Sequence, residues 1–296
     1  MKTDKTVFIL NPISGIQKFR RKRIERKIKK YIEKHDIEAE IWRSKYAGHT
    51  TDLVKKAVDL NIARVVVAGG DGSINEAARS LVYADTSLGI IPSGSGNGLA
   101  HYLKIPFNIK KALDIIFTGT AKYADVLKVN DKYAFSLAGI GLDAMVAKRY
   151  KSLQRRGFFT YLQSAIVEYF NYKPERFIIK YDDKELTETC AFIVFANSDQ
   201  YGYNFRIAPQ ADLFDGYIDV VMVKKIPIVS APLSSIQIFT GRADKILYFS
   251  TFKTKKIEII RDQKGVVNID GDPYETEIST TVEVIEKALK IIVSNE

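Results

Sequence analysis

Two glycine-rich loops, each placed directly after an apolar run, constrain the fold of this 296-residue chain more than any other feature. The loop GGDGSINE follows the run RVVVA, and the loop PSGSGNGLA follows LGII. An uninterrupted apolar run is typical of a strand that is buried on both faces. Segments with helical spacing of apolar residues follow both loops. The pattern predicts a parallel sheet covered by helices on both sides, with the two loops at its carboxyl edge.

This alternation of strand and helix extends over the first 120 residues. Helical spacing recurs at 18–35, 49–60 and 108–119, with apolar strands between these segments. From about residue 121 strands separated by polar turns dominate, interrupted by a clear helix at 157–172 and a candidate helix at 228–240. We predict an α/β domain over 1–124 and a mainly antiparallel β domain over 125–296, whose last strand is a candidate to return to the first domain.

The first loop carries an acid, Asp71, between its glycines, whereas a P-loop carries a lysine. The glycines allow positive φ angles and a close approach of the backbone to a ligand. A carboxylate at this place suits a phosphate bridged by magnesium, or a hydroxyl that must lose its proton. Ser73 and Glu76 also have the spacing of a capping box at the start of a helix, which is a purely structural explanation for both.

The second loop again combines glycines with a hydroxyl residue, Ser95, before a helix. A third turn, Asn11 to Gly15, ends the first strand in the same way. Backbone N–H groups at the start of a helix suit phosphate, so loops on neighbouring strand ends indicate one nucleotide site.

The charge of the chain favours an anionic partner. Its net charge is +10, and the segment 18–30 holds nine basic residues and one acid, while 147–156 holds five basic residues and no acid. Such clusters attract phosphorylated ligands or an anionic membrane surface. We expect no nucleic-acid partner because no helix-turn-helix, zinc-finger or RNP motif occurs. We also expect a cytoplasmic protein without a transmembrane segment, because no apolar run of 18 residues and no signal-peptide core is present.

Taken together, five motifs resemble the diacylglycerol kinase catalytic family, which includes bacterial lipid kinases, sphingosine kinases and ceramide kinases. They are NPISG, GGDGSINE, PSGSGNGLA, APQADLFDGYIDVV (208–221) and NIDGDP (268–273). The resemblance implies an N-terminal Rossmann-like three-layer α/β/α domain and a C-terminal β-sandwich domain, as in NAD kinases. It also implies transfer of the γ-phosphoryl group of ATP to a lipid hydroxyl with Mg²⁺.

The resemblance implies roles for individual residues as well. Asp71 matches the base of sphingosine kinases, and Asp272 stands where bacterial members carry a glutamate base, so that either carboxylate is a candidate for the catalytic base. Asp143 matches a residue that holds the acceptor headgroup in sphingosine kinases. The matches to the ligands of a structural magnesium site in bacterial relatives are Asp212, Asp215 and Tyr217, some of them through backbone carbonyls. The matches to the nucleotide site are Asn11, Ser14, Gly15, Ser44, Gly69, Gly70, Asp71, Gly72, Ser73, Glu76, Ser95, Gly96 and Asn97.

The resemblance leaves the acceptor open. We rank diacylglycerol or a related glycerolipid first and a sphingoid base second. An NAD kinase and a non-catalytic lipid- or nucleotide-binding protein are the alternatives to a lipid kinase. Aromatic residues of the helix at 157–172 could line an acyl-chain pocket, although packing against the core is the commoner role of such a stripe. We expect a peripheral membrane protein, and a homodimer stays open.

Overall fold

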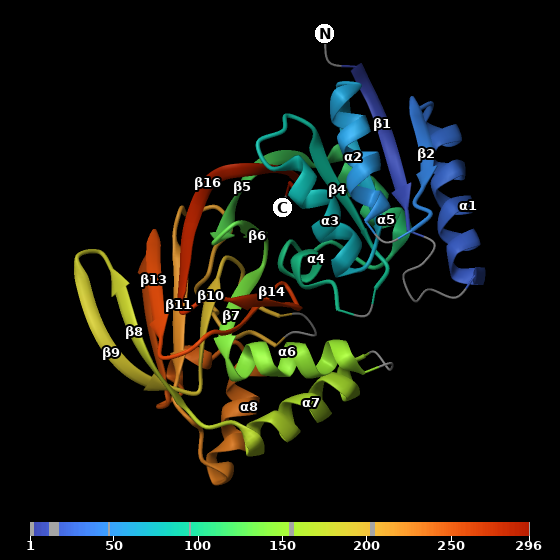
Figure 1. Cartoon of the computed structure of the whole chain (residues 1–296). Coiled ribbons are helices and arrows are strands. Elements are labelled where there is room, and N and C mark those ends of the chain that lie inside the picture. Colours follow the sequence, from blue (N-terminus) through green and yellow to red (C-terminus); the bar gives the residue numbers. More distant parts are fainter. Residues whose placement is uncertain are drawn as a thin grey trace. The chain divides into compact units, whose positions relative to one another are not determined.

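The computed structural model describes residues 3–11, 18–46, 48–94, 96–153, 157–201 and 205–295. The chain divides into two compact units (Figure 1). Unit 1 comprises Met1–Ala124 and Lys287–Glu296, and unit 2 comprises Asp125–Glu286. The last strand, β16 (Ser279–Val293), therefore begins in unit 2 and ends in unit 1.

The elements of unit 1 alternate between strand and helix. They are β1 (Thr3–Leu10), α1 (Lys18–His35), β2 (Ala39–Arg43), α2 (His49–Asp59), β3 (Ile62–Gly69), α3 (Asp71–Leu81), β4 (Ser87–Pro92), α4 (Gly98–Tyr102) and α5 (Ile109–Thr118). The sheet is parallel with the strand order β2-β1-β3-β4, and the end of β16 lies beside β4, where Ile291 pairs with Leu88. Every residue of β4 is buried, as its apolar sequence predicts.

The connections of unit 1 place helices on both faces of this sheet. The chain moves across the sheet in one direction from β1 to β2 and in the other from β2 to β3, so right-handed crossovers put α1 and α2 on opposite faces. Helix α1 packs with α5, where the Tyr31 hydroxyl donates to Asp114 (3.0 Å) and the Tyr31 ring stacks on Phe117. Helix α2 packs with α3. The result is a three-layer α/β/α unit.

The strands of unit 2 form two sheets. They are β5 (Thr120–Val129), which begins in unit 1, β6 (Lys132–Ala134), β7 (Leu137–Gly141), β8 (Glu175–Tyr181), β9 (Lys184–Cys190), β10 (Phe192–Ala196), β11 (Ile218–Val223), β12 (Phe249–Thr254), β13 (Lys256–Arg261), β14 (Gly265–Ile269) and β15 (Asp272–Thr276). One antiparallel sheet has the order β12-β11-β10-β7-β14-β15. In the other, the first part of β16 continues into β13, β8 and β9.

The two sheets of unit 2 share one apolar core. Strands β8 and β13 contribute Phe177 and Ile259 from one sheet, while β10 and β14 contribute Phe195 and Ile269 from the other, all fully buried. Sheets that bury their inner faces against each other in this way form a β-sandwich. The predicted fold, an α/β domain followed by an antiparallel β-sandwich domain, is confirmed.

Helices complete unit 2. They are α6 (Leu142–Ser152), α7 (Phe158–Asn171), η1 (Ile228–Ser230), α8 (Ala231–Phe239) and η2 (Ala243–Lys245). The helix predicted at 157–172 is confirmed as α7, and its aromatic residues divide between two environments. Phe159 and Phe170 are exposed, whereas the Tyr161 ring packs against Tyr150 and the Tyr169 hydroxyl donates to the carbonyl of Ile226. Throughout the described ranges, each helix is too short or too polar to cross a bilayer.

Candidate active site

The carboxyl edge of the unit 1 sheet gathers most of the predicted nucleotide residues. Asn11 follows β1, Ser44 follows β2 and Gly69 ends β3, and parallel strands bring these ends to one edge. The Asn11 amide donates to the Ser73 hydroxyl (2.7 Å), which joins the end of β1 to the first turn of α3. Three predicted residues lie outside the described part of the chain: Ser14, Gly15 and Ser95.

The glycines of the two loops serve close packing of backbone on backbone. A Cβ atom on Gly94 would lie 2.6 Å from the Cα of Gly70, and one on Gly69 would lie 2.7 Å from the Cβ of Ser73. None of Gly69, Gly70 and Gly72 has a positive φ angle, so the loops use the close backbone approach that glycine allows rather than positive φ. The two loops touch at Gly70 and Gly94, which is why these two positions need glycine, whereas a Cβ atom on Gly72 would meet nothing within 4 Å.

Asp71 connects the two glycine loops. Its carboxylate accepts hydrogen bonds from the backbone N–H groups of Asn97 (2.7 Å) and Gly98 (2.8 Å), 26 and 27 residues further along the chain. Gly98 is the first residue of α4, and Asn97 has the left-handed backbone conformation (φ 56°). Each carboxylate oxygen of Asp71 thus holds one backbone amide of the second loop.

Ser73 and Glu76 do not form the capping box that their spacing predicts. Helix α3 begins at Asp71, two residues before Ser73, and its N-cap residue is Gly70 without a side-chain cap. The Glu76 carboxylate instead accepts a hydrogen bond from the backbone of Gly48 (3.3 Å), before α2. Glu76 therefore ties a third loop to this edge of the sheet.

Several polar side chains at this edge are buried without a hydrogen-bond partner among the described residues. Such atoms are uncommon in folded proteins and call for an explanation, for which a bound ligand is one answer. The amide of Asn97 is fully buried and lacks partners on both its nitrogen and its oxygen. The others are the hydroxyl groups of Ser44, Thr50 and Ser93. Sequence reasoning missed Thr50 and Ser93, since only burial distinguishes them from other hydroxyl residues.

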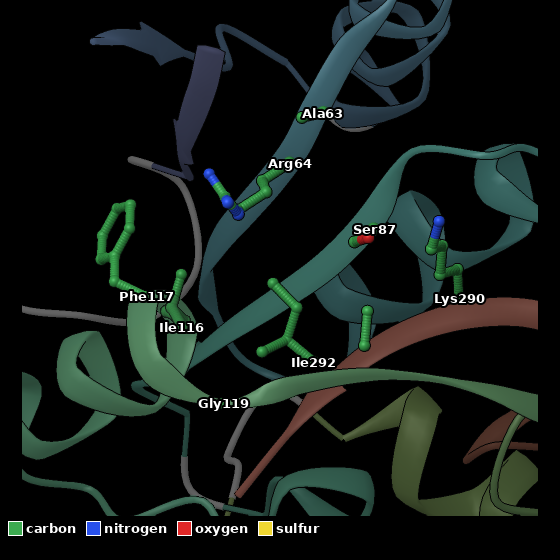
Figure 2. A pocket seen from close by; sticks show the side chains of 9 residues that line it. Ala63, Arg64, Ser87, Ile116, Phe117, Gly119, Lys290 and Ile292 are labelled. Carbon is green, nitrogen blue, oxygen red and sulfur yellow. The ribbon is translucent and has the colours of Figure 1, made fainter. Parts of the chain in front are cut away.

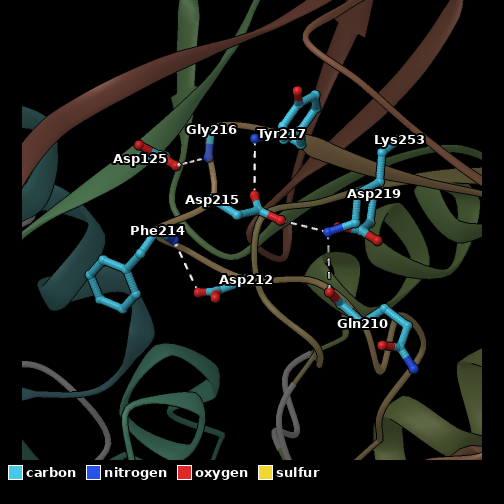
Figure 3. A network of polar contacts seen from close by, with 9 residues as sticks. All are labelled: Asp125, Gln210, Asp212, Phe214, Asp215, Gly216, Tyr217, Asp219 and Lys253. Atoms are coloured by element: carbon cyan, nitrogen blue, oxygen red, sulfur yellow. Dashed lines mark hydrogen bonds and ion pairs between the residues drawn. The ribbon is translucent and has the colours of Figure 1, made fainter.

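In unit 2, the loop before β11 holds the three predicted metal ligands (Figure 3). Its carboxylates close tight turns, since Asp212 accepts from the backbone of Phe214 (3.1 Å) and Asp215 from that of Tyr217 (3.0 Å). Buried Asp125 accepts from the backbone of Gly216 (2.7 Å). Sequence reasoning missed Asp125, although an acid within an apolar strand is a signal that could have indicated it.

Lys253 of β12 forms ion pairs with two acidic residues at this loop. The Lys253 ammonium donates to Asp215 (2.5 Å) and lies 3.3 Å from a carboxylate oxygen of Asp219 (Figure 3). Burial lowers the pKa of Lys253, but the two carboxylates outweigh burial and raise it. Burial raises the pKa of Asp219 against the opposing effect of Lys253. In the described ranges, no three His, Cys, Asp or Glu side chains are grouped to hold a metal ion.

The predicted substrate residue Asp143 lies in a buried polar cluster. Asp143 is 6% exposed, and its carboxylate accepts from the side chain of Asn268 on β14 (2.8 Å). Burial raises the pKa of Asp143 to about 6, against the opposing effect of Asn268. Burial and the nearby charge of Asp143 also raise the pKa values of Tyr161 and Tyr201. The Asp143 carboxyl group therefore exchanges its proton near pH 6, where its neutral and ionised forms are equally populated.

The two acids of the Asp-Gly-Asp turn in unit 2 have different partners. Asp270 accepts from the backbone N–H groups of Phe135 (2.8 Å), Ser136 (2.8 Å) and Leu137 (3.1 Å). Asp272, the first residue of β15, is instead 39% exposed at its side chain and forms an ion pair with Lys151 (3.0 Å). Asp270 therefore holds the turn through three backbone amides, whereas Asp272 is the acid of this turn whose side chain is partly exposed. Asp71 and Asp272 belong to different units.

One cavity of unit 1, of about 240 Å³, lies away from these loops (Figure 2). Arg64 and Ser87 line it near the starts of β3 and β4, together with Lys290. It contains none of the predicted site residues.

Comparisons with known proteins identify the family. The family model of the diacylglycerol kinase catalytic domain matches residues 5–129, and that of the YegS C-terminal NAD kinase β-sandwich-like domain matches 136–293. The chain is 28% identical to a diacylglycerol kinase of Bacillus subtilis over 272 residues, which cover 89% of this chain and 88% of that protein. It is 26% identical to a "Probable lipid kinase YegS-like" of Shewanella frigidimarina over 280 residues, which cover 87% of this chain and 89% of that protein.

A solved structure shares the fold. The crystal structure of a diacylglycerol kinase from Bacillus anthracis matches with a TM-score of 0.74 and 20% identity over 100% of this chain and 98% of that chain. The resemblance inferred from the five motifs is confirmed by the family models. The chain therefore belongs to the diacylglycerol kinase catalytic-domain family, and it is a lipid kinase that uses ATP.

Proposed function

We propose that this enzyme transfers the γ-phosphoryl group of ATP to the hydroxyl of diacylglycerol or a related glycerolipid. The observation that carries the proposal is a set of polar groups at the carboxyl edge of the unit 1 sheet that are buried and, among the residues that the structure describes, have no hydrogen-bond partner: Ser44, Thr50, Ser93 and Asn97. These groups have unused donors and acceptors at the edge of the sheet where a nucleotide would bind. The names of the relatives from Bacillus subtilis and Shewanella frigidimarina support the lipid acceptor.

In this proposal the backbone of the glycine loops holds the phosphates, and Asp71 keeps the two loops together. Asp272 is the base, because its carboxylate is exposed and bonded to one lysine alone among the described residues. The acceptor hydroxyl loses its proton to Asp272 as its oxygen attacks the γ-phosphorus, and ADP leaves with the electron pair of the broken bond. Phosphoryl transfer of this kind depends mainly on positioning and charge stabilisation.

We propose that magnesium enters with the nucleotide, as the MgATP substrate. A resident magnesium at Asp212, Asp215 and Tyr217 stays a prediction. Both oxygens of the Asp215 carboxylate are engaged, one by the backbone of Tyr217 and the other by Lys253. The Lys253 ammonium supplies the positive charge that a cation would otherwise bring to this loop.

The surroundings of Asp143 favour a glycerolipid over a sphingoid base as the acceptor. An ammonium headgroup would need an accessible carboxylate, whereas Asp143 is buried, bonded to Asn268 and has a raised pKa. We also propose that the enzyme is cytoplasmic and binds the membrane peripherally, where its lipid substrate resides.

A direct assay tests the acceptor. Purified protein is given MgATP labelled at the γ-phosphate with dioctanoylglycerol, sphingosine or NAD in separate reactions. We expect label in the dioctanoylglycerol reaction. Label in sphingosine or NAD without label in dioctanoylglycerol would contradict the proposal.

A further inference from the structure

Helix α7 exposes an unbroken apolar face. Phe159, Leu162, Ile166 and Phe170 follow each other at helical spacings of three and four residues, and they are between 42% and 83% exposed. A helix on a folded domain ordinarily turns such a face toward the core. Here the apolar face is turned to solvent, since each of its four side chains is at least 42% exposed.

The segment formed by η1 and α8 has the same property. Ile228, Val229, Leu233 and Ile236 are between 59% and 93% exposed. The opposite side of this helix is the packed one, because Ser234 and Ile238 are buried. Single exposed apolar residues are normal, but two helical faces of this kind need an explanation.

Two contacts within unit 2 fix α7 beside the start of η1. The Tyr169 hydroxyl donates to the backbone carbonyl of Ile226, two residues before η1. The ammonium of Lys225 lies 5.4 Å from the centre of the Tyr169 ring and donates to the carbonyl of Tyr172 (3.3 Å). The two apolar faces therefore belong to one end of unit 2, as Figure 1 shows for α7 and α8. We call the exposed apolar residues of α7, η1 and α8 the α7–α8 face.

The sequence around this face is strongly basic. Residues 148–176 and 224–248 contain eleven basic and three acidic residues, whereas the whole chain contains 45 basic and 35 acidic residues. Among the described cations, Lys148 and Lys173 are exposed next to α7, and Arg242 and Lys245 are exposed around α8. This charge would repel a second copy of the same face, and it would attract an anionic surface.

We infer that the α7–α8 face docks onto an anionic lipid bilayer, with its apolar side chains in the interfacial layer and its lysines and arginines against the headgroups. Apolar side chains flanked by basic ones are the combination that binds such interfaces, through buried apolar area and attraction to anionic lipid. The inference rests on the proposed function in that a kinase acting on a membrane lipid must reach the bilayer. It assigns this task to α7 and α8 rather than to the basic helix α1.

The test is sedimentation of the full-length protein with vesicles made of equal parts phosphatidylglycerol and phosphatidylcholine. In one variant Phe159, Ile166 and Phe170 are all changed to Ser. A matched control changes Leu60 and Tyr83 to Ser, since these residues of unit 1 are similarly exposed. We expect the α7 variant to lose about tenfold or more in partitioning, since each buried side chain contributes appreciably, and the control to bind like the wild type. We also expect wild-type binding to fall with salt.

Other outcomes would overturn the inference. Equal binding of the α7 variant and the wild type would do so, as would a wild-type dimer that becomes a monomer in the α7 variant by sedimentation velocity. Thermal unfolding checks that the variant is folded. Because vesicle binding needs neither ATP nor turnover, failure of the phosphorylation assay leaves this result interpretable. Conversely, if the α7 variant binds vesicles as well as the wild type does, phosphorylation of dioctanoylglycerol still tests the proposed function.

Discussion

Asp71 and Asp272 each follow a glycine, but their carboxylates meet opposite surroundings. The Asp71 oxygens accept two backbone N–H groups from the second glycine loop. Asp272 stands at the start of a strand, partly exposed, with Lys151 as its ion-pair partner. A carboxylate that already satisfies two buried amides holds loops in place, whereas an accessible one can receive a proton. These contacts support our proposal that Asp71 anchors the two loops and that Asp272 is the base, two tasks that the sequence left undivided.

The largest effect is expected from Asp272→Asn. Loss of a general base lowers rates by about 10²- to 10⁴-fold, so we expect kcat for dioctanoylglycerol to fall within that range. The melting temperature should stay close to that of the wild type, because the surface ion pair contributes little. Asp272→Glu is the control, and it should retain activity since it keeps the carboxylate. If Asp272→Asn turns over normally, the assignment of the base is wrong.

Asp71→Asn should act first on stability. Its amide keeps one acceptor oxygen but turns a donor toward a backbone N–H, and a buried donor left unsatisfied costs about 1–3 kcal/mol. We expect a lower free energy of unfolding in urea and a higher KM for ATP, because the loops lose their connection. If kcat falls while the free energy of unfolding and the KM for ATP stay unchanged, Asp71 rather than Asp272 is the base.

The carboxylate of Asp143 offers a third case, because it is buried and accepts its hydrogen bond from the side chain of Asn268. Its pKa of about 6 in the folded protein exceeds the ordinary value, so the folded state binds the proton more tightly. The stability that this tighter proton binding contributes to the folded state is fully present below about pH 4 and is lost as the pH rises through 6. Between pH 4.5 and 7 we expect this group to lower the free energy of unfolding by at most about 2 kcal/mol.

Urea unfolding across this pH range measures the effect. Asp143→Asn should show a shallower fall in stability than the wild type, since its side chain does not titrate. Parallel pH curves for the two proteins would show that Asp143 is not the responsible group.

The smallest effect is expected from Lys151→Met. This change removes the ion-pair partner of Asp272, and exposed pairs contribute about 0–1 kcal/mol. We expect little change in melting temperature and retained kcat, because the base itself is present. A loss of activity as large as that of Asp272→Asn would show that Lys151 has a role in the reaction of its own.

Local patterns predicted the elements of the fold well. The buried run before GGDG became β3, and the periodic segment 18–35 became α1 with the same bounds. The helix at 157–172 was predicted correctly, but the sequence left open which of its apolar side chains pack and which are exposed. Apolar periodicity identifies a face of a helix without identifying what covers it, and in α7 the face is turned to solvent.

The roles of polar residues depended on contacts between distant parts of the chain. The capping box at Ser73 and Glu76 was wrong because α3 begins earlier and Glu76 bonds to Gly48. Lys253 carries no local signal, yet it lies between Asp215 and Asp219 because β12 pairs with β11. A reading of the loop at 208–221 alone could not have found this cation.

The sequence by itself determined that two glycine loops end two buried strands and that an acid stands in the first loop. It did so because strand burial and turn conformation are set by neighbouring residues. Only the tertiary structure decided what that acid touches. Strands β3 and β4 are adjacent, so their loops meet, and the Asp71 carboxylate reaches amides 26 and 27 residues away. A contact over that separation depends on the order of strands in the sheet.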